Sequence, residues 1–531
     1  MKVIEREGSV RIIFDWVDHG VILNTFIASS LVTVFSTIIG ISIAYIMSRL
    51  DFPGKNLLRV MVIVPLLYTP FVNAFVAFKI FGPGGLFSEI PRELGLGFSI
   101  VVQGLSGMIL AQTMMFWPIV YLNVYSSMIQ IDPSLEEQAE NLGARGFKLF
   151  RTVTLPLSLP GVAAGAGIVF LFSMEDLAAP IAFKVSNVMS MKIVDSIKSS
   201  ITIEQLHPDA VVLSLIMVTV AVVWFLALKK YVGLRQYAMI VRGGRWTPRT
   251  RKPGFLAKLV IYLVVFPWVL FSMTPQMGVL VYAFTEEWRG ILPSGFTLDH
   301  FAYIFTDDEP SRALRNSLIY ASAAVAIIVI LSSSSAYVVN RFRTRLAQPI
   351  DTLATIPLVI PGLALATGLI ILFGFGPFKG TPLDPFAFGP ALLLIAAYTI
   401  RKSPFTTRAV YAGLQQVHES LEEAALNLGA SRSKTLFSIV IPLIGINVFS
   451  GALISFVYVM AEVSTSITIG LIDDRQAPLT AIMFDYLTGG YGGGNFINLV
   501  AAMASLILAV QLLVITLTNI VLKQRYAFIG V

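Results

Sequence analysis

The chain has 531 residues, of which 56% are hydrophobic and only 13% are charged. A soluble protein carries about a quarter charged residues, so this composition excludes a soluble protein. The net charge of +7 does not indicate nucleic-acid binding, because the basic residues cluster in short loops between apolar stretches, where they set membrane orientation. The chain is therefore expected to be a multi-pass membrane protein surrounded by lipid.

Cysteine and histidine content excludes several kinds of chemistry. There are no cysteines and only four histidines, so disulfides and thiolate metal sites are ruled out. The histidines lack metal-ligand spacing on a helix, and we expect no metal site and no bound cofactor. Residues 1–18 have no separate apolar core and do not resemble a cleavable signal peptide.

Eleven apolar stretches approach the roughly 20 residues that cross a hydrocarbon core. They predict an all-α fold with five spans in the first half and six in the second. The predicted spans are 21–48, 57–81, 99–125, 157–181, 210–229, 259–285, 316–340, 350–374, 388–411, 443–470 and 497–522.

Charge in the loops predicts their side of the membrane. The segment 229–258 holds nine Lys or Arg and no acidic residue, residues 340–348 are basic, and the C-terminal tail begins with Lys-Gln-Arg at Lys523. These loops are expected on the cytoplasmic side. The N-terminus then lies outside and the C-terminus inside.

An internal repeat organises the chain. Asn24, Ala44-Tyr45, Arg49 and Pro65 recur 292 positions later as Asn316, Ala336-Tyr337, Arg341 and Pro357. Further along the offset is 286, and residues 124–144 share 12 of 21 positions with residues 410–430. The two halves therefore carry the same elements in the same orientation, as parallel, pseudo-symmetric copies.

The repeat sets the predicted domains. Residues 1–228 form a first half, 229–258 a basic cytoplasmic linker, and 259–531 a second half. The span 259–285 has no counterpart before the span 21–48. The basic residues of the linker favour anchoring at lipid headgroups over a specific site.

Two predicted cytoplasmic loops hold the strongest functional signal. They read SLEEQAENLGARGFKLFRTVTLPL from Ser134 and SLEEAALNLGASRSKTLFSIVIPL from Ser420. Ser134 with Glu137, and Ser420 with Glu423, have the spacing of a capping box. Gly143 and Gly429 fit the left-handed position after a short helix.

The rest of each loop predicts a surface helix that re-enters the membrane. One helical face is apolar in both copies, and Pro156 and Pro442 mark re-entry. The faces are Leu135, Ala139 and Leu142, and Leu421, Ala425 and Leu428. Such a helix could simply pack on the bundle, with Glu137 and Glu423 serving only as caps. Two copies in equivalent loops favour docking helices for a two-fold symmetric partner.

These loops resemble the signature loop of binding-protein-dependent ABC importer permeases. The pattern is Glu-Ala-Ala, three residues, Gly, then an apolar run to Leu-Pro, and here it is Glu423-Ala424-Ala425, Gly429 and Pro442. The first copy has Gln138 in place of Ala424. The resemblance covers both halves and implies a type I importer transmembrane fold in a bacterial or archaeal plasma membrane.

The resemblance also implies the partners. The chain lacks the phosphate-binding pattern G-x-x-x-x-G-K-[ST], so it is expected to be a permease and not an enzyme. An ATPase homodimer would use ATP and grip the two loops, and an extracytoplasmic binding protein would deliver substrate. The residues expected to couple to the ATPase are Ser134, Glu137, Ala139, Gly143, Ser420, Glu423, Ala425 and Gly429.

The substrate implied by the resemblance is ferric iron, because fused permeases of this length look most like ferric-iron importers. Thiamine, phosphonate and phosphorylated-metabolite importers are close relatives and remain alternatives. Transport would proceed by alternating access, with docked helices rocking the two halves.

Acidic residues inside spans suggest a pathway, because charge within a membrane is costly. Glu175 and Asp176 lie in the fourth span, and Asp176 aligns with Glu462 at the 286 offset. These carboxylates could line the path of a hard cation such as Fe³⁺. Alternatively, they cap broken helices or bond across the interface between halves.

Two other classes of membrane protein share part of this pattern. An ion-coupled secondary transporter also shows repeated halves, but it does not need paired helices between spans. A polytopic membrane enzyme would need a metal cluster or a nucleophile with its base, and the sequence offers neither.

Overall fold

The computed structural model describes residues 2–6, 9–14, 18–66, 70–96, 98–203, 207–236, 250–289, 292–341, 347–488 and 496–522. Helices dominate these ranges, as predicted, with five short strands in addition. The chain divides into two compact units, residues 1–195 with 219–297, and residues 196–218 with 298–531. Residues 237–249 of the predicted linker lie outside the described residues, whereas helix α11 (Pro208–Gln236) runs into its start and residues 250–258 are described.

The first unit holds the elements up to β5, and helices α10 and α11 are shared between the units. Its helices are α1 (Val21–Arg49), α2 (Lys55–Met61), η1 (Val64–Leu66), α3 (Pro70–Phe81), α4 (Leu86–Glu93), α5 (Gly104–Ile129), α6 (Pro133–Asn141), α7 (Phe147–Leu149), η2 (Phe150–Thr154), α8 (Leu155–Glu175), α9 (Ala178–Ala182), α10 (Met189–Ile203), α12 (Phe255–Val260), η4 (Ile261–Val265), α13 (Phe266–Ser272) and α14 (Thr274–Phe284).

The second unit repeats much of this order. Its helices are α15 (Asp299–Thr306), α16 (Asp308–Arg341), α17 (Ala347–Thr355), η5 (Ile356–Leu358), α18 (Gly362–Ile370), η6 (Ile371–Phe375), α19 (Ala391–Gln416), α20 (Ser420–Asn427), α21 (Arg432–Thr435), η7 (Leu436–Val440), α22 (Ile441–Met460), α23 (Ser464–Gly470), η8 (Asp474–Gln476), α24 (Leu479–Thr488) and α25 (Ile497–Leu522).

The strands form two small sheets in the first unit. Strand β2 (Ser9–Phe14) pairs antiparallel with β1 (Lys2–Arg6) and parallel with β3 (Phe98–Val102), with Val10 opposite Phe98. Strands β4 (Thr285–Arg289) and β5 (Leu292–Phe296) form an antiparallel hairpin. The predicted span 99–125 therefore starts with strand and becomes helical only at Gly104.

The predicted count of eleven spans is not confirmed. Among the described residues, nine helices are long and apolar enough to cross a membrane, and a pair bent by 105° at residues 358–362 would make ten. The predicted span 388–411 corresponds to α19, which is not among them and carries Arg401, Lys402 and Arg408. The predicted span 57–81 is also wrong in its bounds, because the membrane-length helix there is Pro70–Glu93.

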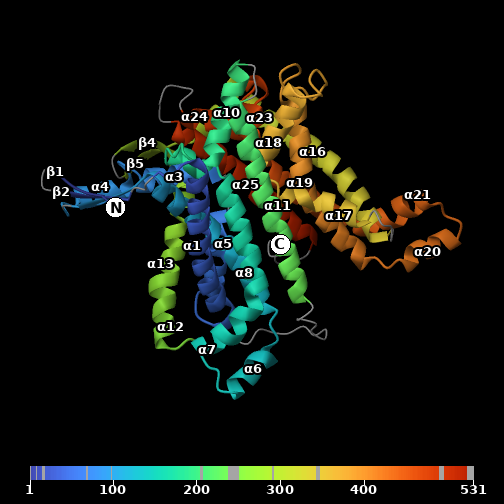
Figure 1. Ribbon diagram of the computed structural model, residues 1–531, viewed down its shortest axis with the longest axis horizontal. Helices are drawn as coiled ribbons and strands as arrows, with labels where there is room; N and C mark the ends of the chain where they lie inside the picture. The colour runs from blue at the N-terminus through green and yellow to red at the C-terminus, as the bar shows by residue number, and fades with distance from the viewer. Residues whose placement is uncertain are drawn as a thin grey trace. The chain divides into compact units, whose positions relative to one another are not determined.

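Three helices in each unit pack together as the core of that half. In the first unit α1, α5 and α8 lie side by side (Figure 1). Helices α16, α19 and α22 contact one another in the same way in the second. Contact is close because small residues face the neighbouring helix. A Cβ atom on Gly40 would lie 2.7 Å from Cβ of Val120, and one on Gly165 would lie 2.8 Å from Cα of Val120.

The repeated asparagines tie one end of each core together. Asn24 Nδ2 donates to the backbone carbonyl of Asn187 at 3.0 Å. Asn316 Nδ2 donates to the carbonyls of Arg475 and Ala477, both at 3.1 Å. The repeated asparagines therefore make equivalent hydrogen bonds in the two units.

The repeated prolines mark a π-helical turn in each unit. Segments η2 and η7 are π-helices that end two residues before Pro156 and Pro442. Proline lacks the N–H of an α-helical bond, and the wider turn accommodates that loss. The helices continue through these turns, from Phe147 to Glu175 and from Arg432 to Met460. The end of each loop is thus continuous with the following span.

The span without a counterpart packs on the first unit. Helix α14 contacts α3, and Gln276 Nε2 donates to the carbonyl of Pro65 at 3.2 Å. Helix α13 contacts α2, where Phe266 lies against Gly54. Residues 255–284 therefore belong to the compact unit of the first half, although the predicted domain bounds place residues from 259 onward in the second.

Candidate functional site

The two loop helices do not begin with the predicted capping boxes. Helix α6 is capped by Asp132, whose carboxylate accepts from the backbone N–H of Ser134 at 2.8 Å. Pro133 occupies the first helical position, for which its fixed φ is suited. In α20 the cap residue is Glu419, which makes no side-chain cap bond, and Ser420 is already helical. The boxes were wrong because both serines lie inside the first turn.

The predicted glycine turns are confirmed. Gly143 has φ +88° and Gly429 has φ +84°. The backbone N–H of Ala144 donates to the carbonyl of Ala139 at 2.9 Å, and that of Ala430 donates to Ala425 at 3.0 Å. With the N–H of each glycine also bonded back to the helix at 3.0 Å, both ends form the same Schellman motif.

The predicted apolar face does not pack as one surface. Ala425 is buried, but Leu142 and Leu428 are 86% and 89% exposed, and Leu135 and Leu421 are also exposed. Glu137 and Glu423 point outward as well, whereas the acid just before each is buried. Each helix therefore presents apolar side chains beside its glycine turn to the outside of its unit.

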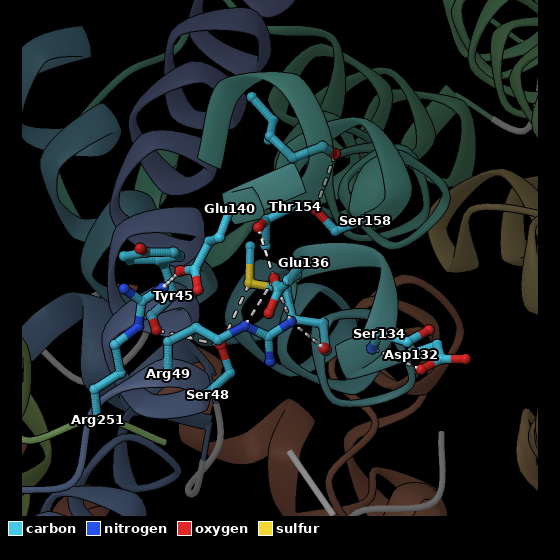
Figure 2. Close-up of polar contacts among 12 residues, drawn as sticks. Tyr45, Ser48, Arg49, Asp132, Ser134, Glu136, Glu140, Thr154, Ser158 and Arg251 are labelled. Atoms are coloured by element: carbon cyan, nitrogen blue, oxygen red, sulfur yellow. Dashed lines mark hydrogen bonds and ion pairs between the residues drawn. The ribbon is translucent and has the colours of Figure 1, made fainter. Parts of the chain in front are cut away.

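The buried acid of α6 forms an ion pair with the end of α1 (Figure 2). Arg49 Nη2 lies 2.9 Å from Glu136 Oε1, and the two side chains are 6% and 7% exposed. Arg49 also donates to the carbonyl of Met128, at the end of α5, at 3.0 Å. Thr154 Oγ1, at the end of η2, donates to Glu136 at 2.8 Å. One carboxylate thus connects α6 to α1 and to the helix that continues into α8.

The second unit repeats this pair. Arg341 Nε donates to Glu422 Oε1 at 2.6 Å, and the side chains are 10% and 12% exposed. Arg341 Nη2 donates to the carbonyl of Val417 at 2.7 Å, just past the end of α19. Tyr337 Oη donates to Glu422 at 2.9 Å, in place of the Thr154 hydroxyl, because the position equivalent to Thr154 is the buried Val440.

These ion pairs attach each loop helix to its core. Removing one partner of a buried pair leaves an uncompensated charge and costs about 3–5 kcal/mol. Sequence reasoning matched Arg49 with Arg341 but did not assign them a partner. The sequence feature that could have indicated the partner is the pair of consecutive glutamates in each loop. The first glutamate of each pair is buried and the second is exposed.

Asp176 lies where α8 breaks from α9. Its carboxylate accepts from the backbone N–H groups of Ala178 and Ala179 at 3.0 and 3.1 Å, and from Gln112 Nε2 at 2.9 Å. Asp176 is therefore a buried cap of a broken helix, which is the alternative that the sequence left open. Glu175 is the last residue of α8 and is half-buried.

Glu462 lies at the equivalent break between α22 and α23. Its carboxylate is buried, accepts from Thr465 Oγ1 at 3.1 Å, and forms ion pairs with Arg401 and Lys402 of α19. At the 286 offset the first half has Met115 and Phe116 in place of these two basic residues. The two breaks are thus built alike but differ in charge.

The structure brings the predicted residues together at two ends of each unit. The loop residues lie at one end, and the acids lie at the helix breaks toward the other. Across the part of the chain that is described, no group of three His, Cys, Asp or Glu side chains could hold a metal ion. A role for the acids in a pathway stays a prediction.

Comparisons with known proteins identify the repeated domain. A family described as binding-protein-dependent transport system inner membrane component matches residues 36–235 and again 328–526. Each match includes one loop helix and its Arg–Glu pair. The repeat in the sequence is thus a repeat of this domain.

Curated relatives include long and short permeases. The ferric transport system permease protein FbpB of Actinobacillus pleuropneumoniae is 26% identical over 493 residues, covering 92% of this chain and 69% of the relative. A putative ferric transport system permease of Haemophilus influenzae is 27% identical over 86% of this chain and 71% of its own length. The molybdenum permease ModB of Escherichia coli K12 is 33% identical over 32% of this chain and 72% of its own length. With its domain matched twice and its membrane-spanning helices, the chain belongs to the family of binding-protein-dependent transport system inner membrane components, the multi-pass permeases of ABC importers.

Proposed function

We propose that this permease carries ferric iron into the cell, driven by an ATPase homodimer that docks on α6 and α20. The observation that carries the coupling part is the repeated loop geometry. Both helices end in the same glycine turn, expose a leucine at 86% or 89%, and pair a buried glutamate with an arginine of the core. Two equivalent surfaces suit two identical ATPase subunits.

The coupling residues have separate roles in this proposal. The residues that face outward, Glu137 with Leu142 and Glu423 with Leu428, contact the ATPase. Ala139 and Ala425 let the helix lie close to its core, and Gly143 and Gly429 set the direction of the chain. Ser134 and Ser420 lie in the first helical turn.

The mechanism follows from the rigid connections. When ATP draws the ATPase subunits together, α6 and α20 move with them. Arg49 and Arg341 transfer that movement to α1 and α16, and the π-turns transfer it to α8 and α22. Each half then moves as a body, which alternates access to a path for substrate received from an extracytoplasmic binding protein.

Ferric iron is favoured by the names of two relatives that extend over most of the chain. The experiment is uptake of radioactive ferric iron into proteoliposomes that hold the permease, its ATPase and its binding protein. Uptake should require both ATP and the binding protein. Absent iron uptake, with ATPase activity still stimulated by the binding protein, would reject iron, and molybdate, phosphonates, thiamine and phosphorylated metabolites would be tested next.

A further inference from the structure

We propose that the end of the segment joining the two halves is part of the first coupling site, because Arg251 holds helix α6 through Glu140, a contact that we call the brace. The inference concerns Arg251 and Glu140, neither of which belongs to the repeated signature. Its functional part rests on the proposed docking of an ATPase on α6. Its structural part does not.

The backbone of Arg251 is attached to the end of α1. Its N–H donates to the carbonyl of Arg49 at 2.9 Å, and its carbonyl accepts from the N–H of Asp51 at 2.9 Å. Together they form an isolated parallel bridge between Leu50 and Arg251. The end of the joining segment is thus placed beside the arginine that already holds α6.

The side chain of Arg251 reaches α6 directly. Its Nη2 lies 2.9 Å from Glu140 Oε1, with the side chains 45% and 20% exposed. Glu136 and Glu140 are one helical turn apart and share a face. Figure 2 shows Arg49 and Arg251 each directed at one of these two acids. Helix α6 is therefore held at two successive turns.

The second loop has the first of these two acids but not the second. Its equivalents of Glu136 and Glu140 are Glu422 and Leu426, and Leu426 is 41% exposed. The second acid thus occurs in the copy that lies next to the joining segment. This distribution indicates that Glu140 is matched to Arg251 and is not a general requirement of the loop.

The brace also connects α6 to the span that follows. Helix α12 begins at Phe255, four residues after Arg251. Tyr262 Oη then donates to the carbonyl of Pro53 at 3.0 Å. Movement of α6 is therefore transmitted to α12 and α13 as well as to α1 and α8. The two identical ATPase subunits would meet two unequal loops.

The test combines single variants with a charge exchange. Arg251→Met and Glu140→Leu, the latter installing the residue of the second loop, should each lower uptake per ATP hydrolysed by about two- to fivefold, the range that a partly exposed ion pair supports. The exchange Arg251→Glu with Glu140→Arg should restore it. Lys252→Met, a change at the neighbouring exposed basic residue, should have no effect.

A second readout does not depend on substrate or ATPase. The chain has no cysteine, so the double variant Arg251→Cys with Glu140→Cys can be cross-linked without background. A short thiol-specific cross-linker should join the two positions in the intact permease, whereas it should not join Lys252→Cys to Leu94→Cys, an exposed position of the same unit at the end of α4. Failure to cross-link, or coupling unchanged by Arg251→Met and Glu140→Leu, would overturn the proposal. If the two cysteines cross-link but the permease takes up no iron, the proposed substrate is refuted and the contact between positions 251 and 140 stands.

Discussion

Arg49 and Arg341 each end a long helix and hold a loop helix with the same side chain. Their guanidinium groups also satisfy carbonyls at the end of α5 and α19, where cationic side chains are favourable. An arginine suits this position because its planar fork serves a carboxylate and a carbonyl at once. Lysine could replace the charge but not both sets of bonds.

Replacing Arg341 tests the ion pair. Arg341→Met leaves Glu422 buried with Tyr337 as its donor, so we expect stability to fall by about 3–5 kcal/mol and ATP-driven uptake to fall more than tenfold. Arg341→Lys should retain part of the stability and part of the ATP-driven uptake. Thermal unfolding in detergent and uptake in proteoliposomes measure the two effects. Equal behaviour of the methionine and lysine variants would contradict a role for the charge.

The glycine turns give a second prediction, for Gly429→Val. Its Cβ would meet nothing within 4 Å, so any defect comes from the left-handed backbone, which costs a β-branched residue about 1–3 kcal/mol. We expect the turn to rearrange and transport to be lost while the permease still inserts. Gly445→Val is the matched control, because its Cβ also meets nothing within 4 Å but its backbone is helical. A defect of equal size in the control would show that backbone conformation is not the cause.

Sequence reasoning succeeded at the residues whose role is local. The glycine turns follow from a backbone preference that one residue type satisfies. The N-caps could not be assigned as reliably, because Asp132 and Ser134 are both good capping residues and Pro133 decides between them. The Arg–Glu pairs join positions 87 residues apart in the first unit, so no local pattern could reveal them.

The helix breaks at Asp176 and Glu462 are built in the same way. Both carboxylates accept hydrogen bonds from the start of the next helix, so each connects the two parts of a broken span. The second break has two basic residues where the first has Met115 and Phe116. Glu462 therefore also compensates the positive charges of Arg401 and Lys402.

Replacing Glu462 distinguishes charge compensation from a role in the substrate pathway. Glu462→Gln leaves two buried cations without their shared carboxylate, and we expect a loss of about 3–5 kcal/mol, seen as a lower unfolding temperature. The triple variant Arg401→Met, Lys402→Phe and Glu462→Gln removes the charges together and should recover most of that stability. If Glu462 also lines the pathway, the triple variant should fold and yet fail in uptake. Normal uptake by the triple variant would reject the pathway role.

Hydropathy predicted most long helices but not where they break. Apolar stretches identify α1, α8 and α25 because each of these helices is apolar over a length that can cross a membrane. The break after η5 and the strand before Gly104 use residues as apolar as those of a helix, so composition alone does not reveal them. Helix α19 shows the reverse case, since Arg401 and Lys402 are paired with Glu462 within the protein and do not prevent a long helix.

The two similar halves of the molecule were predictable from the repeat, and the family match to both halves agrees. The repeat did not predict that residues 255–284 join the compact unit of the first half, because that segment has no counterpart to compare. The bond from Gln276 to Pro65 depends on tertiary packing. Sequence order and structural grouping therefore differ at the junction of the halves.

The two loops should be needed together for binding the ATPase. Leu142 and Leu428 are almost fully exposed, so Leu142→Asp and Leu428→Asp should not change the unfolding temperature of the permease. Each should weaken capture of the ATPase, because a buried carboxylate in an apolar pocket is unfavourable, and the double variant should abolish capture. If the ATPase dimer grips both loops at once, the loss in the double variant exceeds the product of the single losses, because each remaining contact keeps the second subunit at high local concentration.

Leu298→Asp is the control for that experiment. Leu298 is 65% exposed and precedes α15, on the side predicted to be extracytoplasmic. It should leave ATPase capture unchanged while adding the same charge. Undiminished capture by the double variant would place the ATPase elsewhere on the permease and would remove the basis for coupling through α6 and α20. A larger loss in one single variant than in the other would mean that the subunits depend on the loops unequally, as the contact between Arg251 and Glu140 leads us to expect.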